Sequence, residues 1–202
     1  MEHQIWINPI LIGMEEMSWL ETIAVFFGLA SVFFSIKRNI LVFPTGIVST
    51  LIYVWICFQV RLYADMGINA YYFSMSIYGW YLWANPKPGK KELPVTWLSV
   101  RGWGVTMALL IASYLTLHAV LHFFTDSDVP VWDALTTSFA FVGMWLMAKK
   151  KVENWIAWIL TDLISVPLYL YKGLPLTAFQ FGVFTIMACI GLYSWIKAEK
   201  GK

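Results

Sequence analysis

The dominant pattern in the chain is a series of long apolar segments, separated by short stretches with charge, proline or glycine. A helix needs about 20 apolar residues to cross the hydrocarbon core of a bilayer, and the segments are close to that length. The pattern therefore predicts an all-α polytopic membrane protein with seven transmembrane helices. Their expected ranges are Trp19–Ile36, Ile40–Gln59, Asp65–Ala84, Gly102–Phe124, Val131–Ala148, Val152–Tyr171 and Leu174–Ile196.

Composition supports the same class of protein. Of the 202 residues, 59% are apolar and only 13% are charged, whereas soluble domains are about 45–50% apolar and about 25% charged. In water, such a chain would expose large apolar patches, which excludes a water-soluble enzyme. Residues 1–18 lack the pattern of a cleaved signal peptide and are predicted to be a retained segment that lies along the membrane interface.

The basic residues predict an orientation. Lys and Arg gather on cytoplasmic loops of membrane proteins, and here twelve of the fourteen fall on one side of the predicted spans. The C-terminus is therefore expected in the cytoplasm and the N-terminus outside. The twelve are Lys37, Arg38, Lys87, Lys90, Lys91, Arg101, Lys149, Lys150, Lys151, Lys197, Lys200 and Lys202, and the other two are Arg61 and Lys172.

The sequence also contains an internal repeat. The range 19–83 aligns with 131–195 without a gap, with about eleven identities that include the closing Gly-x-Tyr-x-Trp. Three spans leave the chain on the opposite side of the membrane from where it started. A fourth span is therefore needed so that the second copy begins on the same side as the first. The chain is thus divided into an N-terminal segment (1–18), a first three-helix bundle (19–84), a loop and linker helix (85–130), a second three-helix bundle (131–196) and a cytoplasmic tail (197–202).

Polar side chains within spans are costly and therefore point to function. Asp162 is the only acidic residue near the middle of a span, and Trp155, Trp158 and Tyr169 share its helix face at helical spacing. An acid flanked by aromatic rings suits a flat, cationic or hydroxyl-bearing ligand. The equivalent face of the first repeat lacks the acid and both tryptophans, so we expect an asymmetric site. Packing of Asp162 against a neighbouring helix is the alternative.

Amide side chains are the second group of candidates. Gln59 follows Trp55 by one turn, Asn69 shares a stripe with Tyr72, and Gln180 lies in the last span. Amides both donate and accept hydrogen bonds, as sugar hydroxyls require. Hydrogen bonding between helices is the alternative for each.

The tryptophans are predicted to have two roles. Trp83 and Trp195, at the cytoplasmic ends of their spans, are expected to anchor the protein at the lipid interface, while Trp55 and Trp158 are expected to form walls of the ligand site. No metal or disulfide is expected, because Cys57 and Cys189 lie alone in apolar runs.

A family resemblance rests on motifs in both halves. The first half holds Phe58-Gln59, Leu62-Tyr63-Ala64 and the run Tyr78-Gly79-Trp80-Tyr81-Leu82-Trp83, and the second holds Trp132-Asp133, the run Val152-Glu153-Asn154-Trp155, Trp158 and Ile164-Ser165. With these motifs, the chain from about Trp19 to Trp195 resembles the PnuC family of nicotinamide riboside transporters.

The resemblance implies a SWEET-like fold of 3+1+3 helices in the bacterial inner membrane. It also implies transport of nicotinamide riboside, a vitamin B3 precursor of NAD, by facilitated diffusion with alternating access and phosphorylation of the substrate in the cytoplasm. A sugar or another nucleoside or vitamin remains an alternative substrate. An enzyme is not expected, since the spans lack a nucleophile with a base, paired acids or a metal cluster. Neither a cofactor nor a nucleic acid partner is expected, and the oligomeric state, including a homo-oligomer, is left open.

Overall fold

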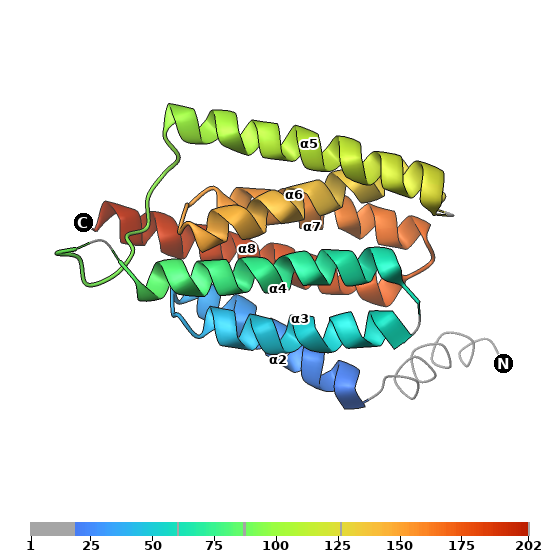
Figure 1. Cartoon of the computed structure of the whole chain (residues 1–202), viewed down its shortest axis with the longest axis horizontal. Coiled ribbons are helices and arrows are strands. Elements are labelled where there is room, and N and C mark those ends of the chain that lie inside the picture. The colour runs from blue at the N-terminus through green and yellow to red at the C-terminus, as the bar shows by residue number, and fades with distance from the viewer. Residues whose placement is uncertain (1–18, 60, 87, 126, 202) are drawn as a thin grey trace.

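The chain forms a bundle of long helices that run back and forth between two ends (Figure 1). This computed structural model describes residues 19–59, 61–86, 88–125 and 127–201, and the predicted interfacial segment 1–18 lies outside them. The described residues form seven helices and no strand. The helices are α2 (Trp19–Ile36), α3 (Val42–Gln59), α4 (Tyr63–Ala84), α5 (Val100–Phe124), α6 (Pro130–Ala148), α7 (Asn154–Tyr171) and α8 (Pro175–Lys200).

The predicted repeat is visible in the way the helices end. Left-handed backbone occurs at Arg38 (φ 56°) and Lys150 (φ 55°), and again at Arg61 (φ 61°) and Gly173 (φ 73°). The two members of each pair occupy equivalent positions in the sequence repeat. After each one, an N–H bonds to the carbonyl five residues back, which terminates the helix: Asn39 to Phe34, Lys151 to Leu146, Leu62 to Cys57 and Leu174 to Tyr169, at 2.8–2.9 Å.

Helix packing inside the repeats follows the same symmetry. α2 and α4 both contact α3, and α6 and α8 both contact α7. Gly79 of α4 lies directly against the ring of Phe43, and its repeat equivalent Gly191 of α8 lies against the ring of Trp155. Glycine is needed at both positions because a Cβ would overlap the ring. These contacts allow the second and third helices of each repeat to approach closely.

The two repeats meet through crossed contacts. α4 of the first repeat packs on α6 of the second, and α8 of the second packs on α2 of the first. Tyr71 of α4 donates a hydrogen bond to the carbonyl of Phe141 (2.9 Å) and stacks on its ring at 4.1 Å between centroids. The linker helix α5 packs on α6, at the outside of the bundle (Figure 1).

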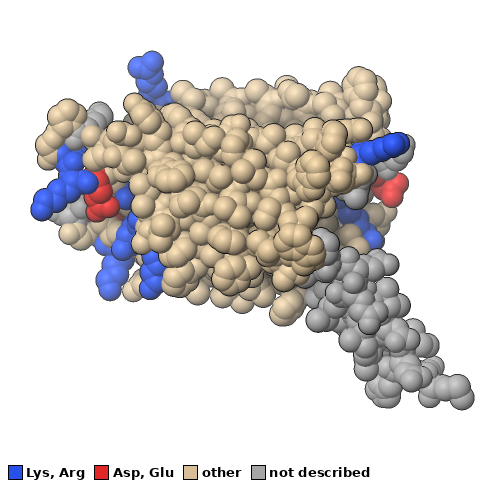
Figure 2. All heavy atoms as spheres, turned by 60° about the horizontal axis from the view of Figure 1, so that its bottom comes forward, with Lys and Arg blue, Asp and Glu red and all other residues tan. Residues whose placement is uncertain are grey.

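The outer surface between the two ends suits a bilayer. Figure 2 shows the Lys, Arg, Asp and Glu side chains at both ends, with an uncharged belt between them on the face displayed. Large apolar side chains such as Phe26, Ile111 and Ile186 are more than half exposed on the outside of the bundle. Five of the helices, α2, α3, α5, α6 and most of α8, combine the length and the apolar composition of a membrane span. We call the end that holds the turns 37–41 and 149–153 and the connection 85–99 the basic end.

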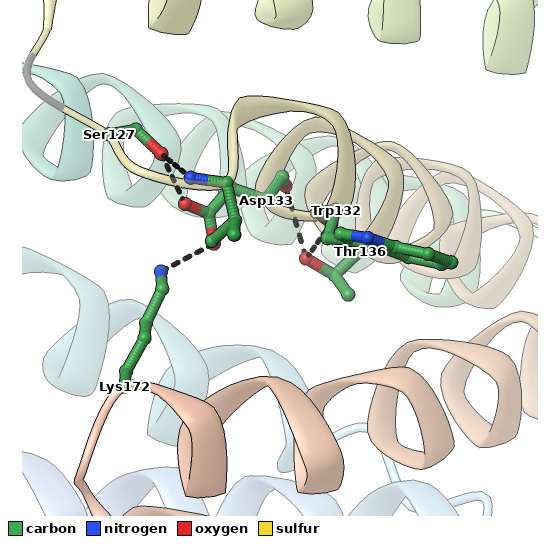
Figure 3. A network of polar contacts seen from close by, with 6 residues as sticks. Ser127, Trp132, Asp133, Thr136 and Lys172 are labelled. Carbon is green, nitrogen blue, oxygen red and sulfur yellow. Dashed lines mark hydrogen bonds and ion pairs between the residues drawn. The ribbon is translucent and has the colours of Figure 1, made fainter.

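The opposite end of the second repeat is held together by Asp133, in the first turn of α6 (Figure 3). One carboxylate oxygen forms an ion pair with Lys172 of the α7–α8 turn (2.6 Å), and the other accepts a hydrogen bond from Ser127 (2.7 Å). Both ionic side chains remain partly exposed, so water weakens the pair. Asp133 therefore ties the α5–α6 connection and the α7–α8 turn to one helix end.

The predicted role of Trp83 and Trp195 as lipid-interface anchors is wrong. Their side chains are 7% and 0% exposed and belong to the core at the basic end. Their indole N–H groups bond to carbonyls of the other repeat, at Ala148 (3.1 Å) and Ser35 (2.9 Å). The error has a physical cause: a tryptophan at the end of a span can face either lipid or protein, and hydropathy does not distinguish the two.

Candidate substrate-binding site

A cavity of about 420 Å³ lies between the two repeats. A volume of a few hundred Å³ suits a small organic ligand. Many of its lining residues occupy equivalent positions in the two copies, so the repeats enclose it jointly. These pairs are Gly28/Ala140, Val32/Met144, Ser35/Met147, Gly46/Trp158, Ser49/Thr161, Thr50/Asp162, Tyr72/Phe184 and Ser76/Ala188.

The wall from the second repeat is aromatic and acidic. Asp162 is 4% exposed and, among the described residues, its carboxylate accepts no hydrogen bond and forms no ion pair. Trp158, one turn earlier in α7, lies against Gly143, where a Cβ would be 3.0 Å from the indole ring. Tyr169 stacks on Phe181 at 5.1 Å between ring centroids. A carboxylate without a partner beside aromatic faces can bind a flat cation or a donor group.

Trp155 adds a hydrogen-bond donor to this wall. Its side chain is 2% exposed and lines the cavity, and its Nε1–H is buried without an acceptor in the described part of the chain. A buried donor of this kind is costly unless something accepts its hydrogen. The ring is fixed by its edge-to-face contact with Trp195, so this donor has a fixed position in the cavity wall.

The wall from the first repeat consists of small, polar residues. At Gly46, a Cβ would lie 3.1 Å from Ser31 Oγ and 3.4 Å from Ser76 Oγ, so the missing side chain lets two hydroxyls come close to the backbone of α3. Ser31 donates to the carbonyl of Val42 at 2.8 Å. Ser76 is 1% exposed, and no hydrogen bond to its hydroxyl is present within the described residues. This wall offers hydroxyl groups on small side chains, and the wall opposite offers rings and charge.

Tyr72 of α4 lies between the two walls. Its ring centroid is 6.4 Å from that of Trp158 in the second repeat, and it lines the cavity together with Ser76 one turn later in α4. Tyr72 therefore extends the aromatic surface onto the first repeat and brings a hydroxyl group to the same place.

The two ends of the cavity differ in exposure among the described lining residues. Asp65, in the first turn of α4 and far from the basic end, lines the cavity and is exposed. At the basic end, the lining residues Ser35, Val42, Met147 and Trp155 are all buried. The structure is thus open away from the basic end and closed towards it.

Five of the nine residues predicted for the site line this cavity: Tyr72, Trp155, Trp158, Asp162 and Tyr169. The other four, Trp55, Gln59, Asn69 and Gln180, are not among its lining residues. Trp55 is 55% exposed on the outer surface of α3, and Gln59 and Gln180 are also exposed. Asn69 donates its amide hydrogen to the carbonyl of Asp65 at 2.9 Å, within its own helix.

Sequence reasoning did not find the contribution of α2 and α6. Gly28, Ser31 and Ser35 of α2 and Thr136 and Thr137 of α6 all line the cavity. The signal was a stripe of small residues at helical spacing that recurs in the same repeat position. No group of His, Cys, Asp and Glu side chains in the described ranges has the arrangement of a metal site.

Two parallel three-helix repeats around a polar, aromatic-lined cavity are the architecture of a membrane transporter, in which substrate is bound at the interface of the repeats. The chain belongs to the family described as the nicotinamide mononucleotide transporter, whose model matches residues 18–197. This is a family of membrane transporters and not of enzymes.

Individual relatives agree with this family. The chain is 25% identical over 217 residues to the nicotinamide riboside transporter PnuC of Escherichia coli K12, an alignment that covers 95% of this chain and 91% of the relative. It is 24% identical over 198 residues to the riboflavin/roseoflavin transporter RibM of Streptomyces davaonensis, covering 94% and 91%. A crystal structure of the vitamin B3 transporter PnuC matches the fold with a TM-score of 0.72 at 22% identity, covering 96% of this chain and 88% of that one.

Proposed function

We propose that this transporter carries nicotinamide riboside across the bacterial inner membrane by facilitated diffusion. The observation that carries the proposal is the two-sided chemistry of the cavity, with rings and a carboxylate on one wall and hydroxyls on the other. Nicotinamide riboside has the same division, since a flat, positively charged pyridinium ring is joined to a ribose with free hydroxyls.

The pyridinium ring belongs on the wall from the second repeat. Trp158 and Tyr169 offer aromatic faces, on which a planar cation is stabilised by stacking and by the ring quadrupole. Asp162 supplies the negative charge, which is effective because water is largely excluded there. The carboxamide of the ligand can accept the hydrogen of Trp155 Nε1, which the described residues leave without an acceptor.

The ribose belongs on the wall from the first repeat. Gly46 lines the cavity without a side chain, and Ser76 and Tyr72 supply hydroxyls that can donate or accept. In this proposal, hydroxyl groups bind the ribose in place of the amides of Gln59, Asn69 and Gln180, which lie outside the cavity lining.

Charge favours the riboside over the mononucleotide. Two acids, Asp65 and Asp162, line the cavity, and none of the described lining residues is Lys, Arg or His. The phosphate of a mononucleotide would be repelled by these acids and would find no cation to bind it. Riboflavin is the second candidate, because it combines a flat ring with a polyol and one relative is a riboflavin/roseoflavin transporter.

We further propose that the basic end faces the cytoplasm, with the N-terminus outside and the C-terminus inside. The described loops and helix ends at the basic end carry most of the Lys and Arg residues of the chain, and such residues favour the cytoplasmic side. The cavity would then open to the outside in this structure. Phosphorylation of the ribose in the cytoplasm would add charge and keep the product from returning.

Uptake into proteoliposomes tests the proposal. We expect labelled nicotinamide riboside to equilibrate across the membrane without any ion gradient. We also expect it to accumulate only when a nicotinamide riboside kinase and ATP are enclosed in the vesicles. Strict dependence of the flux on a proton or sodium gradient would contradict the passive mechanism.

A competition panel tests the substrate. Nicotinamide riboside, nicotinamide mononucleotide, riboflavin, ribose and nicotinamide are added in turn at equal concentration to the same vesicles. We expect the unlabelled riboside to compete most strongly and the mononucleotide least. Stronger competition by riboflavin would favour the second candidate.

A further inference from the structure

Two tryptophans from opposite repeats pack behind the residues that line the closed end of the cavity. Trp83 of α4 and Trp195 of α8 occupy equivalent repeat positions, and their ring centroids are 6.2 Å apart. Both rings belong to the core cluster at the basic end, together with Trp155 of the cavity wall. A substrate that leaves at this end has to pass these side chains.

The contacts of Trp83 join the first repeat to the second. Its indole N–H donates to the carbonyl of Ala148, the last residue of α6, at 3.1 Å. The ammonium group of Lys150, in the turn after α6, lies 4.4 Å from the ring centroid and pairs with Glu92 at 3.0 Å. Lys150 is 3% exposed, so the cation–π contact is formed away from water, where it is strongest. We call Trp83, Ala148, Lys150 and Glu92 the first latch.

The contacts of Trp195 join the second repeat to the first. Its indole N–H donates to the carbonyl of Ser35, in the last turn of α2, at 2.9 Å. In the turn after α2, Arg38 donates to the carbonyl and the hydroxyl of Ser194 at 2.9 and 3.0 Å. The hydroxyl of Ser194 in turn donates to the carbonyl of Ile36 at 3.1 Å. We call Trp195, Ser35, Arg38 and Ser194 the second latch.

The two latches have the same arrangement, formed by equivalent positions of the two repeats. The tryptophans Trp83 and Trp195 are repeat equivalents, and so are the two cations, Arg38 and Lys150. In each latch, a tryptophan from the third helix of one repeat caps the end of the first helix of the other repeat. The cation after that first helix then contacts the third helix, at the tryptophan ring or at the residue before it. Separation of the repeats at the basic end must break both latches.

We propose that these two crossed latches hold the basic end of the cavity closed, and that both must open before substrate can leave there. The inference rests on the proposed function, because only a carrier with alternating access needs this end to open. The tryptophans act as positioning residues: they set which end of the cavity is open, and substrate contacts remain with the residues of the walls.

Side-specific labelling of a cavity cysteine tests the latches. The parent variant carries Cys57→Ala, Cys189→Ser and Ala188→Cys, since Ala188 lines the cavity and belongs to the core cluster at the basic end. A membrane-impermeant thiol reagent is added from one face of oriented vesicles at a time, without substrate. In the parent variant, we expect labelling from the face opposite the basic end and little from the basic end.

Conservative variants then open the latches. Trp83→Phe and Trp195→Phe keep an aromatic ring but lose the hydrogen bond, and each should raise the labelling rate from the basic end by about fivefold, the effect of one hydrogen bond. The double variant should raise it by about the product of the two. Trp80→Phe is the matched control, because Trp80 lies in the same motif on α4 and is 41% exposed, and it should leave the rate unchanged.

Two results would contradict the proposal that the latches hold the basic end closed. One is a labelling rate from the basic end that is the same in Trp83→Phe and Trp195→Phe as in Trp80→Phe. The other is an equal rise from both faces, which would indicate general loosening of the bundle. Flux of nicotinamide riboside is measured in the same vesicles. An absence of flux in the wild type would contradict the proposed function. The labelling rates would still show whether the latches keep the basic end closed.

Discussion

At the scale of single residues, the asymmetry of the site comes from exchanges between equivalent positions. In the second repeat, the ring of Trp158 lies against Gly143. At the equivalent positions of the first repeat, Gly46 lies against Ser31. Where the second has Asp162, the first has Thr50, whose hydroxyl bonds to a carbonyl of its own helix at 2.9 Å. The scaffold is nearly symmetric, so these few side chains make the two walls of the cavity chemically different.

The role of the Asp162 charge can be tested with Asp162→Asn, which keeps the shape of the side chain. We expect affinity for nicotinamide riboside to fall about tenfold or more, because hydrogen bonds and contacts to charged groups contribute about 1.5–3 kcal/mol. Binding of uncharged riboflavin should change less. Affinities are measured by titration calorimetry in detergent, with Asp128→Asn, in an exposed loop, as the control. Equal affinity of Asp162→Asn and wild type would show that the charge is not used.

The proposed ribose wall can be tested with Gly46→Ala. The new methyl group would lie 3.1 Å from Ser31 Oγ and 3.4 Å from Ser76 Oγ, so it would displace hydroxyls of the wall proposed for the ribose. We expect weaker binding with little change in melting temperature, because the close contacts of the methyl group and the higher helix propensity of alanine, about 1 kcal/mol, have opposite effects on stability. Gly67→Ala, where a Cβ would meet nothing within 4 Å, should leave binding intact. If Gly46→Ala bound the ligand with wild-type affinity, the ribose would not lie beside Gly46.

At the scale of elements, close contact between the second and third helices of each repeat depends on glycine. Gly79 allows α4 to approach Phe43 of α3, and Gly191 allows α8 to approach Trp155 of α7. Phe43 is completely buried and packs edge-to-face on Trp83 at 5.0 Å between centroids. The helix contacts therefore hold both the cavity wall and the tryptophans of the latches in place.

Gly79→Ala should destabilise the protein, because the added methyl group would overlap the ring of Phe43. Overpacking of a well-packed core costs about 1–3 kcal/mol, so we expect a clear decrease in melting temperature. Thermal unfolding of the purified protein in detergent measures it. Gly182→Ala in α8, where a Cβ would meet nothing within 4 Å, is the control. A melting temperature as high in Gly79→Ala as in this control would contradict the packing argument.

At the scale of the whole molecule, the two ends are stabilised by different contacts. The basic end has two latches that join the repeats. The ion pair of Asp133 and Lys172 at the other end lies within the second repeat, so it stabilises that repeat without linking it to the first. This difference is consistent with a cavity that is open away from the basic end.

The orientation of the molecule can be tested with a protease site and an epitope tag added after the C-terminus. Because the basic end is proposed to face the cytoplasm, the tag should resist protease in intact spheroplasts and be cleaved after lysis. A tag placed before the N-terminus should behave in the opposite way. Cleavage of the C-terminal tag in intact cells would reverse the proposed orientation, and the transport assay would be unaffected.

The sequence by itself determined the helices, their number in the described chain and their repeat, because apolar length and charge are local properties. All seven predicted spans overlap observed helices, and the repeat reappears in the backbone at Arg38 and Lys150. The prediction of Asp162 and its aromatic neighbours as site residues was made in the same way, since a polar residue within a span is conspicuous, and these residues line the cavity.

Only the tertiary structure decided which side of each helix faces the cavity, the partner repeat or the lipid. Gln59 and Gln180 are polar residues of the predicted spans, as Asp162 is, yet they lie outside the cavity lining, whereas Ser31 and Gly46 line it. Trp83 and Trp195 have the sequence of lipid anchors but are buried between repeats. The physical reason is that lipid and protein interior are both apolar, so the hydrophobic pattern of a span does not specify its neighbour, which is set by packing and hydrogen bonds between distant parts of the chain.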